Sequence, residues 1–431
     1  MMFFRSIIIL LLTLHNAFAI NIIRDAEIES VINEIANPII KATKLTSDIK
    51  IYIVDNKEIN AYATSGNLVF INHGLILKSQ TPEMVAGVLA HEFGHIKAGH
   101  AITRKKIFAD ASLMHAAVLL MTIGSSLLVN SPEAVWALMV KGVDTVEKIK
   151  YRYTRDQEQA ADMAAINFLQ SAGYSPHGII DMLKLTSRYD RIYSDLYART
   201  HPFSMDRINI IKPYVGAWKT RQIIDPFRFN LAKAKLEAYL AEDKGSKLLA
   251  KIARKNDDIS HYQKAIIYLK KYNLLKAEEE MQSLLIKYNN NPYFNELYAQ
   301  ILLEKKEVSK ALEYMKKALN HDSKSPLLLT QHAILLLGAF DLTKESYYAK
   351  EAIKALERAN TLERDYINFQ MLARAYGYVD NIALAEYNLA EANFIIGDYR
   401  TARKHANRAM KFKNLNSKTK TRLADIVKLA E

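Results

Sequence analysis

The spacing of hydrophobic positions divides this chain into two parts. Residues 23–42 repeat apolar side chains at a helical period, whereas residues 48–55 alternate isoleucine with other side chains as a strand does. Residues 60–72 hold two short strand-like runs around a Ser-Gly-Asn turn signal. Because helix and strand patterns are mixed over one stretch, we predict an α+β domain, which we place at residues 20–225.

Two longer helices are expected within this domain. Thr81 offers an N-cap, Pro82 suits the first helical turn, and Glu83 places a negative charge near the positive end of the helix dipole. The apolar run that follows predicts a helix reaching to about His100. A later helix is predicted from Tyr153 to Leu169.

From about residue 226 the pattern changes to Ala, Leu, Lys and Tyr at helical spacing, and an internal repeat emerges. Ala265, Ala299 and Ala333 lie 34 residues apart, which is the period of tetratricopeptide repeats. Small residues are needed where the two helices of each unit cross closely. The pattern predicts an all-α tetratricopeptide-repeat solenoid over residues 226–431. Near the C-terminus, alanines spaced 12 and 7 residues apart occur in two overlapping sets, so we expect one helix to serve two units: Ala373, Ala385 and Ala392, and Ala390, Ala402 and Ala409. An unrelated helical bundle is the alternative.

Two apolar segments lie outside these patterns. Residues 1–19 resemble a signal peptide, with Arg5 before an apolar run and Ala17-Phe18-Ala19 as a cleavage site. We therefore expect an exported protein, with an uncleaved anchor as the alternative. Residues 113–129 form a stretch of 17 residues without a charge, marginally short for a membrane span. Two interpretations of this stretch are left open: it is one arm of a buried helical hairpin, or it lies against a membrane.

The amino-acid composition limits the catalytic groups, metal ligands and partners that this chain can use. The chain has no cysteine, which excludes disulfides and thiol catalysis and limits any metal site to histidine and carboxylate ligands. Its net charge is +13, and nine basic residues but no acidic ones lie between Arg400 and Arg422. This stretch is a solvated helix face, a site for an acidic partner, or a contact with an anionic membrane. Nucleic acid is not expected, because no recognition motif is present.

The sequence His91-Glu92-Phe93-Gly94-His95 carries the candidate chemistry. Residues four apart lie one turn apart on the same helix face, so His91 and His95 can reach one ion. Zinc accepts imidazole nitrogen and prefers four ligands. Glu92 follows the first ligand directly and can take a proton from metal-bound water. We predict one zinc ion per chain and Glu92 as the catalytic base.

A third ligand is expected from the later helix. Glu158 would complete the two-histidine, one-glutamate set of catalytic zinc sites. Asp162 lies one turn further along the same face and could accept a proton from the far nitrogen of a bound histidine. A solvated helix face is the alternative for both residues. The set predicts metal-assisted hydrolysis of an internal peptide bond.

These motifs resemble a known family. The chain is similar to the zincin-type endopeptidases related to HtpX and to the CAAX prenyl endopeptidases. It is most similar to exported members with C-terminal tetratricopeptide repeats, among them the β-barrel assembly-enhancing proteases. The resemblance rests on His91–His95, Glu158–Asp162, the segment His201-Pro202-Phe203-Ser204-Met205-Asp206-Arg207 and the strand Asn60-Ala61-Tyr62-Ala63. Prenyl endopeptidases have many membrane spans and this chain has no convincing one, which argues against prenylated substrates.

The resemblance implies a periplasmic protease that acts on unfolded or misassembled envelope proteins. The repeats would bind substrate or the outer-membrane assembly machinery, and peripheral membrane contact is a further implication. The alternative is a repeat-based chaperone or scaffold at the membrane surface whose protease activity is secondary or latent. A scaffold carrying an inactive protease domain is disfavoured by the full ligand set.

The resemblance also implies that the segment from His201 to Arg207 returns to the metal. Because Pro202 disfavours a helical conformation at the residue before it, His201 should lie on a loop. His201 would either donate to the oxyanion or act as a fourth ligand that keeps the enzyme latent. Arg207 would steady Glu158 or the oxyanion. The alternatives are that His201 caps the next helix and that Arg207 lies on the protein surface.

The strand that contains Asn60 and Ala61 is a candidate substrate-binding element. An extended substrate could pair with its backbone as an added strand. Ordinary pairing within the sheet is the alternative.

Overall fold

The computed structural model describes residues 22–45, 49–64, 67–100, 155–193, 201, 204–216, 218 and 225–429. They form two compact units, with the division between Glu237 and Ala238. The signal-like residues 1–19 and the apolar stretch 113–129 lie outside the described residues.

The first unit contains a small four-stranded sheet. Its strands are β1 (Ile22–Ile23), β2 (Lys50–Val54), β3 (Ala61–Thr64) and β4 (Leu68–Asn72), in the order β1-β2-β4-β3. β2 and β4 are parallel, while both outer pairs are antiparallel. The predicted pair of strands around the Ser-Gly-Asn turn is therefore confirmed, and β3 lies at one edge of the sheet.

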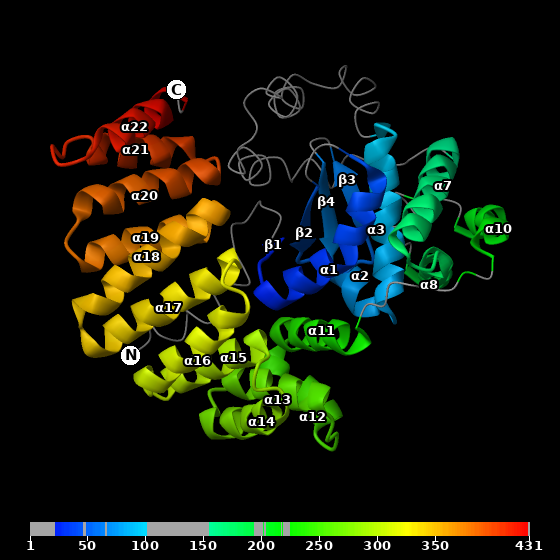
Figure 1. Ribbon diagram of the computed structural model, residues 1–431, viewed down its shortest axis with the longest axis horizontal. Helices are drawn as coiled ribbons and strands as arrows, with labels where there is room; N and C mark the ends of the chain where they lie inside the picture. Colours follow the sequence, from blue (N-terminus) through cyan, green and yellow to red (C-terminus); the bar gives the residue numbers. More distant parts are fainter. Residues whose placement is uncertain are drawn as a thin grey trace. The chain divides into compact units, whose positions relative to one another are not determined.

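Helices surround this sheet in the first unit. They are α1 (Ala26–Thr43), α2 (His73–Lys78), α3 (Pro82–Lys97), α7 (Arg155–Ala172), α8 (His177–Tyr193) and α10 (Ser204–Val215), followed by α11 (Pro226–Leu240). α3 packs against α1, α7, α8 and β3 (Figure 1). Its residues from Leu89 to His95 are almost fully buried, so any polar group there is enclosed by protein.

Several helix boundaries differ from the sequence prediction, and α7 continues to Ala172 rather than ending at the predicted Leu169. Ile23 belongs to β1, because the Asp25 carboxylate accepts hydrogen bonds from the Glu27 and Ile28 amides and starts α1 only at Ala26. α3 begins as predicted, with Pro82 in its first turn, but it ends at Lys97 rather than near His100.

The second unit is all-α over its described residues. After a short 3-10 turn (Asp243–Gly245) come α12 (Ser246–Ile252), α13 (Asp258–Lys270), α14 (Leu274–Lys287), α15 (Pro292–Glu304), α16 (Val308–His321), α17 (Pro326–Thr343), α18 (Ser346–Leu362), α19 (Tyr366–Tyr378), α20 (Ile382–Ile395), α21 (Tyr399–Ala409) and α22 (Ser417–Leu429). From α13 onward, each helix packs against the next (Figure 1).

The repeated alanines lie where these helices meet. Ala265, Ala299 and Ala333 are 0% exposed, as the predicted close crossings require. α20 packs against both α19 and α21, as the other helices of this unit pack against their neighbours.

One helix among the described residues, α17, is long and apolar enough to span a membrane by length and composition. Its 18 residues have a mean hydropathy of 1.3, and half of them are buried. A core helix of a folded unit has the same character, and α17 packs against α16 and α18.

Candidate metal centre

α3 supplies three polar side chains to the interior of the first unit. His91, Glu92 and His95 are 1%, 0% and 0% exposed. Because His91 and His95 lie one helical turn apart, their Nε2 atoms approach to 3.1 Å. The helix thus presents two imidazoles to a single point, as the spacing of the motif predicts.

α7 brings a carboxylate to the same point. The Oε2 atom of Glu158 lies 3.4 Å from Nε2 of His91, and its Oε1 atom lies 3.4 Å from Nε2 of His95. Gly94 makes this approach possible, because a Cβ there would lie 2.7 Å from the carbonyl oxygen of Ala161. A larger residue at Gly94 would push α7 away from α3.

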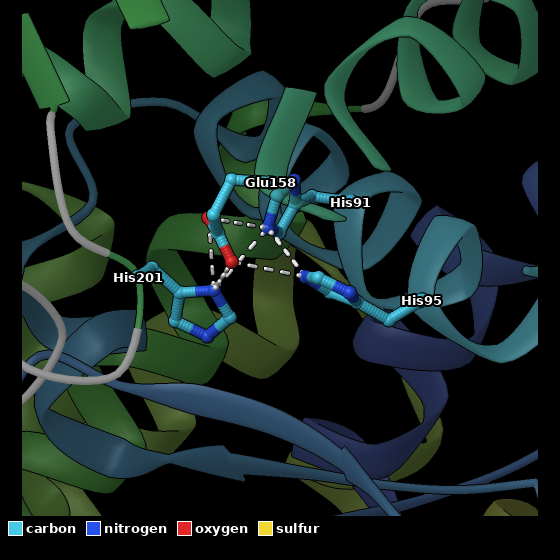
Figure 2. Close-up of side chains that lie close together, drawn as sticks. All are labelled: His91, His95, Glu158 and His201. Carbon is cyan, nitrogen blue, oxygen red and sulfur yellow. Dashed lines mark hydrogen bonds and ion pairs between the residues drawn. The ribbon is translucent and has the colours of Figure 1, made fainter. Parts of the chain in front are cut away.

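His201 completes the cluster from the segment that precedes α10. Its Nδ1 atom lies 3.0 Å from Oε1 of Glu158 and 3.3 Å from Nε2 of His91. One ligand atom from each of His91, His95, Glu158 and His201 lies within 4.8 Å of all the others (Figure 2). Buried imidazole and carboxylate groups that converge in this way fit a transition-metal ion.

Glu92 borders the cluster and also contacts the sheet. Its Oε2 atom accepts a hydrogen bond of 2.8 Å from the Ala63 amide of β3, while Oε1 lies 3.5 Å from Nε2 of His201. Burial raises the pKa of Glu92 above its usual range. Glu92 is therefore a buried carboxyl with an increased affinity for protons, held beside the candidate ligands.

Asp162 and Arg207 form a buried pair behind the ligands. Arg207 donates to both carboxylate oxygens of Asp162 at 2.8 and 2.7 Å, and its Nη1 lies 2.7 Å from Oε2 of Glu158. Burial alone would raise the pKa of Asp162, but Arg207 and His91 lower it to about 2. Arg207 is only 3% exposed, so it lies against the carboxylates rather than on the surface.

Asp162 also orients His91. Its Oδ1 atom lies 2.9 Å from Nδ1 of His91, on the far side of the ring from the cluster. Burial and Arg207 lower the pKa of His91, but Asp162 and Glu158 outweigh them and raise it to about 9. A carboxylate at Nδ1 keeps Nε2 directed toward the other ligands.

A second orienting contact was missed at the sequence level. Nδ1 of His95 lies 2.8 Å from Nδ1 of His100, just beyond the end of α3. The signal in the sequence was a third histidine five residues after His95. Each histidine on α3 therefore has a polar partner for its outer nitrogen, which holds its inner nitrogen in place.

The proposed substrate strand lies at the edge of the sheet. Ala61 begins β3 and pairs with Ile71, while the Asn60 carbonyl accepts a hydrogen bond from the Asn72 amide. Both side chains are buried, at 2% for Asn60 and 0% for Ala61. The β4 side of this strand is thus occupied, and among the described residues no strand pairs with its other side.

Comparison with known proteins gives the family that the first unit resembles. Residues 23–215, just under half of the chain, match Peptidase family M48. This match confirms the resemblance inferred from the sequence motifs.

Several named proteins are similar to this chain in sequence. The beta-barrel assembly-enhancing protease of Yersinia pestis is 26% identical over 293 residues, or 65% of this chain and 59% of the relative. Its Escherichia coli K12 counterpart is 23% identical over 295 residues, with the same shares covered. Metalloprotease YcaL of Escherichia coli K12 is 25% identical over 171 residues, or 39% of this chain and 63% of the relative. The match thus spans about three fifths of the length of the beta-barrel assembly-enhancing proteases.

Proposed function

We propose that this chain is an exported zinc-dependent endopeptidase that hydrolyses internal peptide bonds of envelope proteins. One observation carries the proposal. A buried carboxyl with a raised pKa, Glu92, borders a cluster of three imidazoles and one carboxylate that converge on one point. A buried acid beside a metal-binding cluster is the arrangement that peptide hydrolysis needs.

The donor set supports zinc as the resident ion. His91, His95 and Glu158 form the ligand set of catalytic zinc sites, and the chain has no cysteine to favour softer metals. Bound zinc would supply a Lewis acid that polarises the scissile carbonyl and acidifies water. Arg207 balances the negative charge of Glu158 and Asp162 and so holds the ligand helix in place.

Glu92 would move the proton in this reaction. Its Oε1 atom faces the cluster while Oε2 is anchored by the Ala63 amide. The free face of the carboxylate would take a proton from the attacking water and pass it to the leaving amine nitrogen. Because Ala63 lies in β3, the same hydrogen bond fixes the base relative to the strand that would pair with substrate.

His201 would restrain the enzyme. Its ring lies between Glu158 and Glu92, at 3.0 Å from one and 3.5 Å from the other. A reacting water would have to lie between the ligands and the base, which is the position that this ring occupies. The geometry favours His201 as a fourth ligand that keeps the site latent over its role as an oxyanion donor.

The helical unit would act as a tetratricopeptide-repeat scaffold for substrate or partner proteins. The buried alanine grid at 34-residue intervals supports this assignment. The relatives are named for β-barrel assembly, which supports a role in the periplasm of a Gram-negative envelope. Misassembled outer-membrane proteins are the substrates that fit this role.

Metal analysis combined with peptide cleavage tests the proposal. The purified chain should contain one zinc ion and cleave an unfolded protein such as casein, and a chelator should remove both properties. Glu92→Gln should retain zinc and lose cleavage by at least about a hundredfold, because general base catalysis contributes that much or more. Glu83→Gln is the matched control, since Glu83 lies in the first turn of the same helix. Normal cleavage by Glu92→Gln would refute the mechanism.

A further inference from the structure

The last two helices and the turn between them carry a large excess of positive charge. Residues 399–429 contain ten basic residues and a single acidic one, Asp425. Nine of the basic side chains are exposed, and we call them the C-terminal basic surface: Arg400, Arg403, Lys404, Arg408, Lys411, Lys413, Lys418, Lys420 and Lys428. The tenth, Arg422, is half-buried and pairs with Glu391.

Ion pairing is sparse on this surface. Some earlier exposed lysines of the same unit pair with acids, such as Lys310 with Glu307 at 2.7 Å and Lys354 with Glu351 at 2.6 Å. Within the C-terminal basic surface, only Arg408 has an acidic partner among the described residues, at 3.6 Å. With a single acid among residues 399–429, most of the positive charge of the C-terminal basic surface stays available to an external anion.

Apolar side chains are exposed among these charges. Met410 is 39% and Phe412 is 38% exposed, and they alternate with Lys411 and Lys413 in the turn after α21. Ala402, Ala406 and Ala409 of α21 point into the core of the unit instead. The basic residues of α21 therefore occupy the opposite, outward face of that helix, next to the turn.

We propose that the C-terminal basic surface binds an anionic phospholipid membrane, with Met410 and Phe412 entering the headgroup region. Lysines attract an anionic lipid surface, and apolar side chains beside them gain by leaving water at the acyl boundary. An acidic protein would account for the charge, but it gives no reason for apolar side chains to alternate with lysines in an exposed turn. The membrane contact is independent of peptidase activity.

Vesicle binding by the full-length mature chain tests this proposal. The chain should sediment with vesicles of phosphatidylcholine and phosphatidylglycerol, but not with vesicles of phosphatidylcholine alone. High salt should release it, because the attraction falls off within a Debye length. Equal binding to both kinds of vesicle, or binding to neither, would overturn the proposal.

Two double variants test whether vesicle binding depends on the C-terminal basic surface or only on the net charge of the chain. Lys411→Gln with Lys413→Gln should weaken vesicle partitioning about 25-fold, or about fivefold for each lysine removed. Lys310→Gln with Lys354→Gln is the matched control, because it removes the same charge from exposed lysines of the same unit, and it should change partitioning less than about twofold. An equal loss in both pairs would mean that only net charge matters, and the proposal would fall.

Phe412→Ser distinguishes a membrane from an acidic polypeptide. It should weaken vesicle partitioning and leave binding to polyglutamate unchanged, with thermal unfolding as the check on folding. If Phe412→Ser leaves vesicle partitioning unchanged and the chain binds polyglutamate more tightly than vesicles, the surface serves an acidic protein instead.

Discussion

Replacing Asp162 with asparagine removes one negative charge behind the metal cluster while keeping the shape of the side chain. In the native protein the Asp162 carboxylate accepts two hydrogen bonds from Arg207, at 2.8 and 2.7 Å, and lies 2.9 Å from Nδ1 of His91. All three side chains are nearly fully buried. The side-chain amide introduced by Asp162→Asn can satisfy one of these donors through its oxygen, but its NH2 group faces another donor.

Asp162→Asn should lower both the free energy of unfolding and the affinity for zinc. Breaking a buried ion pair by removing one partner costs about 3–5 kcal/mol. Loss of the partner that orients a metal-bound histidine typically weakens metal affinity by about 10–100-fold, or about 1.4–2.7 kcal/mol. Asp162→Asn should therefore bind zinc at least about tenfold more weakly and unfold more readily even without metal.

Asp206→Asn is the matched control for this variant. Asp206 also pairs with an arginine, Arg155, at 3.0 Å, but both side chains are more than half exposed. An exposed ion pair contributes at most about 1 kcal/mol to stability. The zinc affinity of Asp206→Asn should therefore equal that of the native protein. Zinc affinity is measured by competition with a chromophoric chelator, and stability by urea unfolding of the metal-free protein. Native zinc affinity in Asp162→Asn would refute the reasoning.

Two other buried side chains give predictions of their own. His201→Ala should raise peptide cleavage, because the proposed fourth ligand is removed; a loss of about 10²–10³-fold would assign His201 to the oxyanion instead. Burial raises the pKa of Glu391, but hydrogen bonds from Arg422 and the charge of Arg364 outweigh it and lower the pKa below its usual range. A lowered carboxyl pKa stabilises the fold above the unfolded value of about 4.3, and the stabilisation is lost as pH falls through the folded value. Because Arg422 and Arg364 stay partly exposed to water, Glu391→Gln should lower the free energy of unfolding by about 1–3 kcal/mol at neutral pH and flatten its decline in acid; an unchanged acid profile in urea unfolding would contradict this.

Local sequence determined those features of the protein that depend on residues close together in the chain. The spacing of His91 and His95 places both on one face of any helix, whatever surrounds it. In the same way, the Ser-Gly-Asn signal predicted the β3–β4 turn, and the alanine period predicted the tightly packed helices of the second unit. These inferences needed only the geometry of a helix or a turn.

The tertiary structure decided which distant side chains meet. Sequence spacing cannot show that Gly94 lets α7 approach α3, nor that Arg207 lies between Asp162 and Glu158. The convergence of His201 on the cluster was expected only from family resemblance, and the contact of His100 with His95 was not expected at all. Such contacts depend on how separate helices pack, and packing is set by the burial of whole faces rather than by the local spacing of residues.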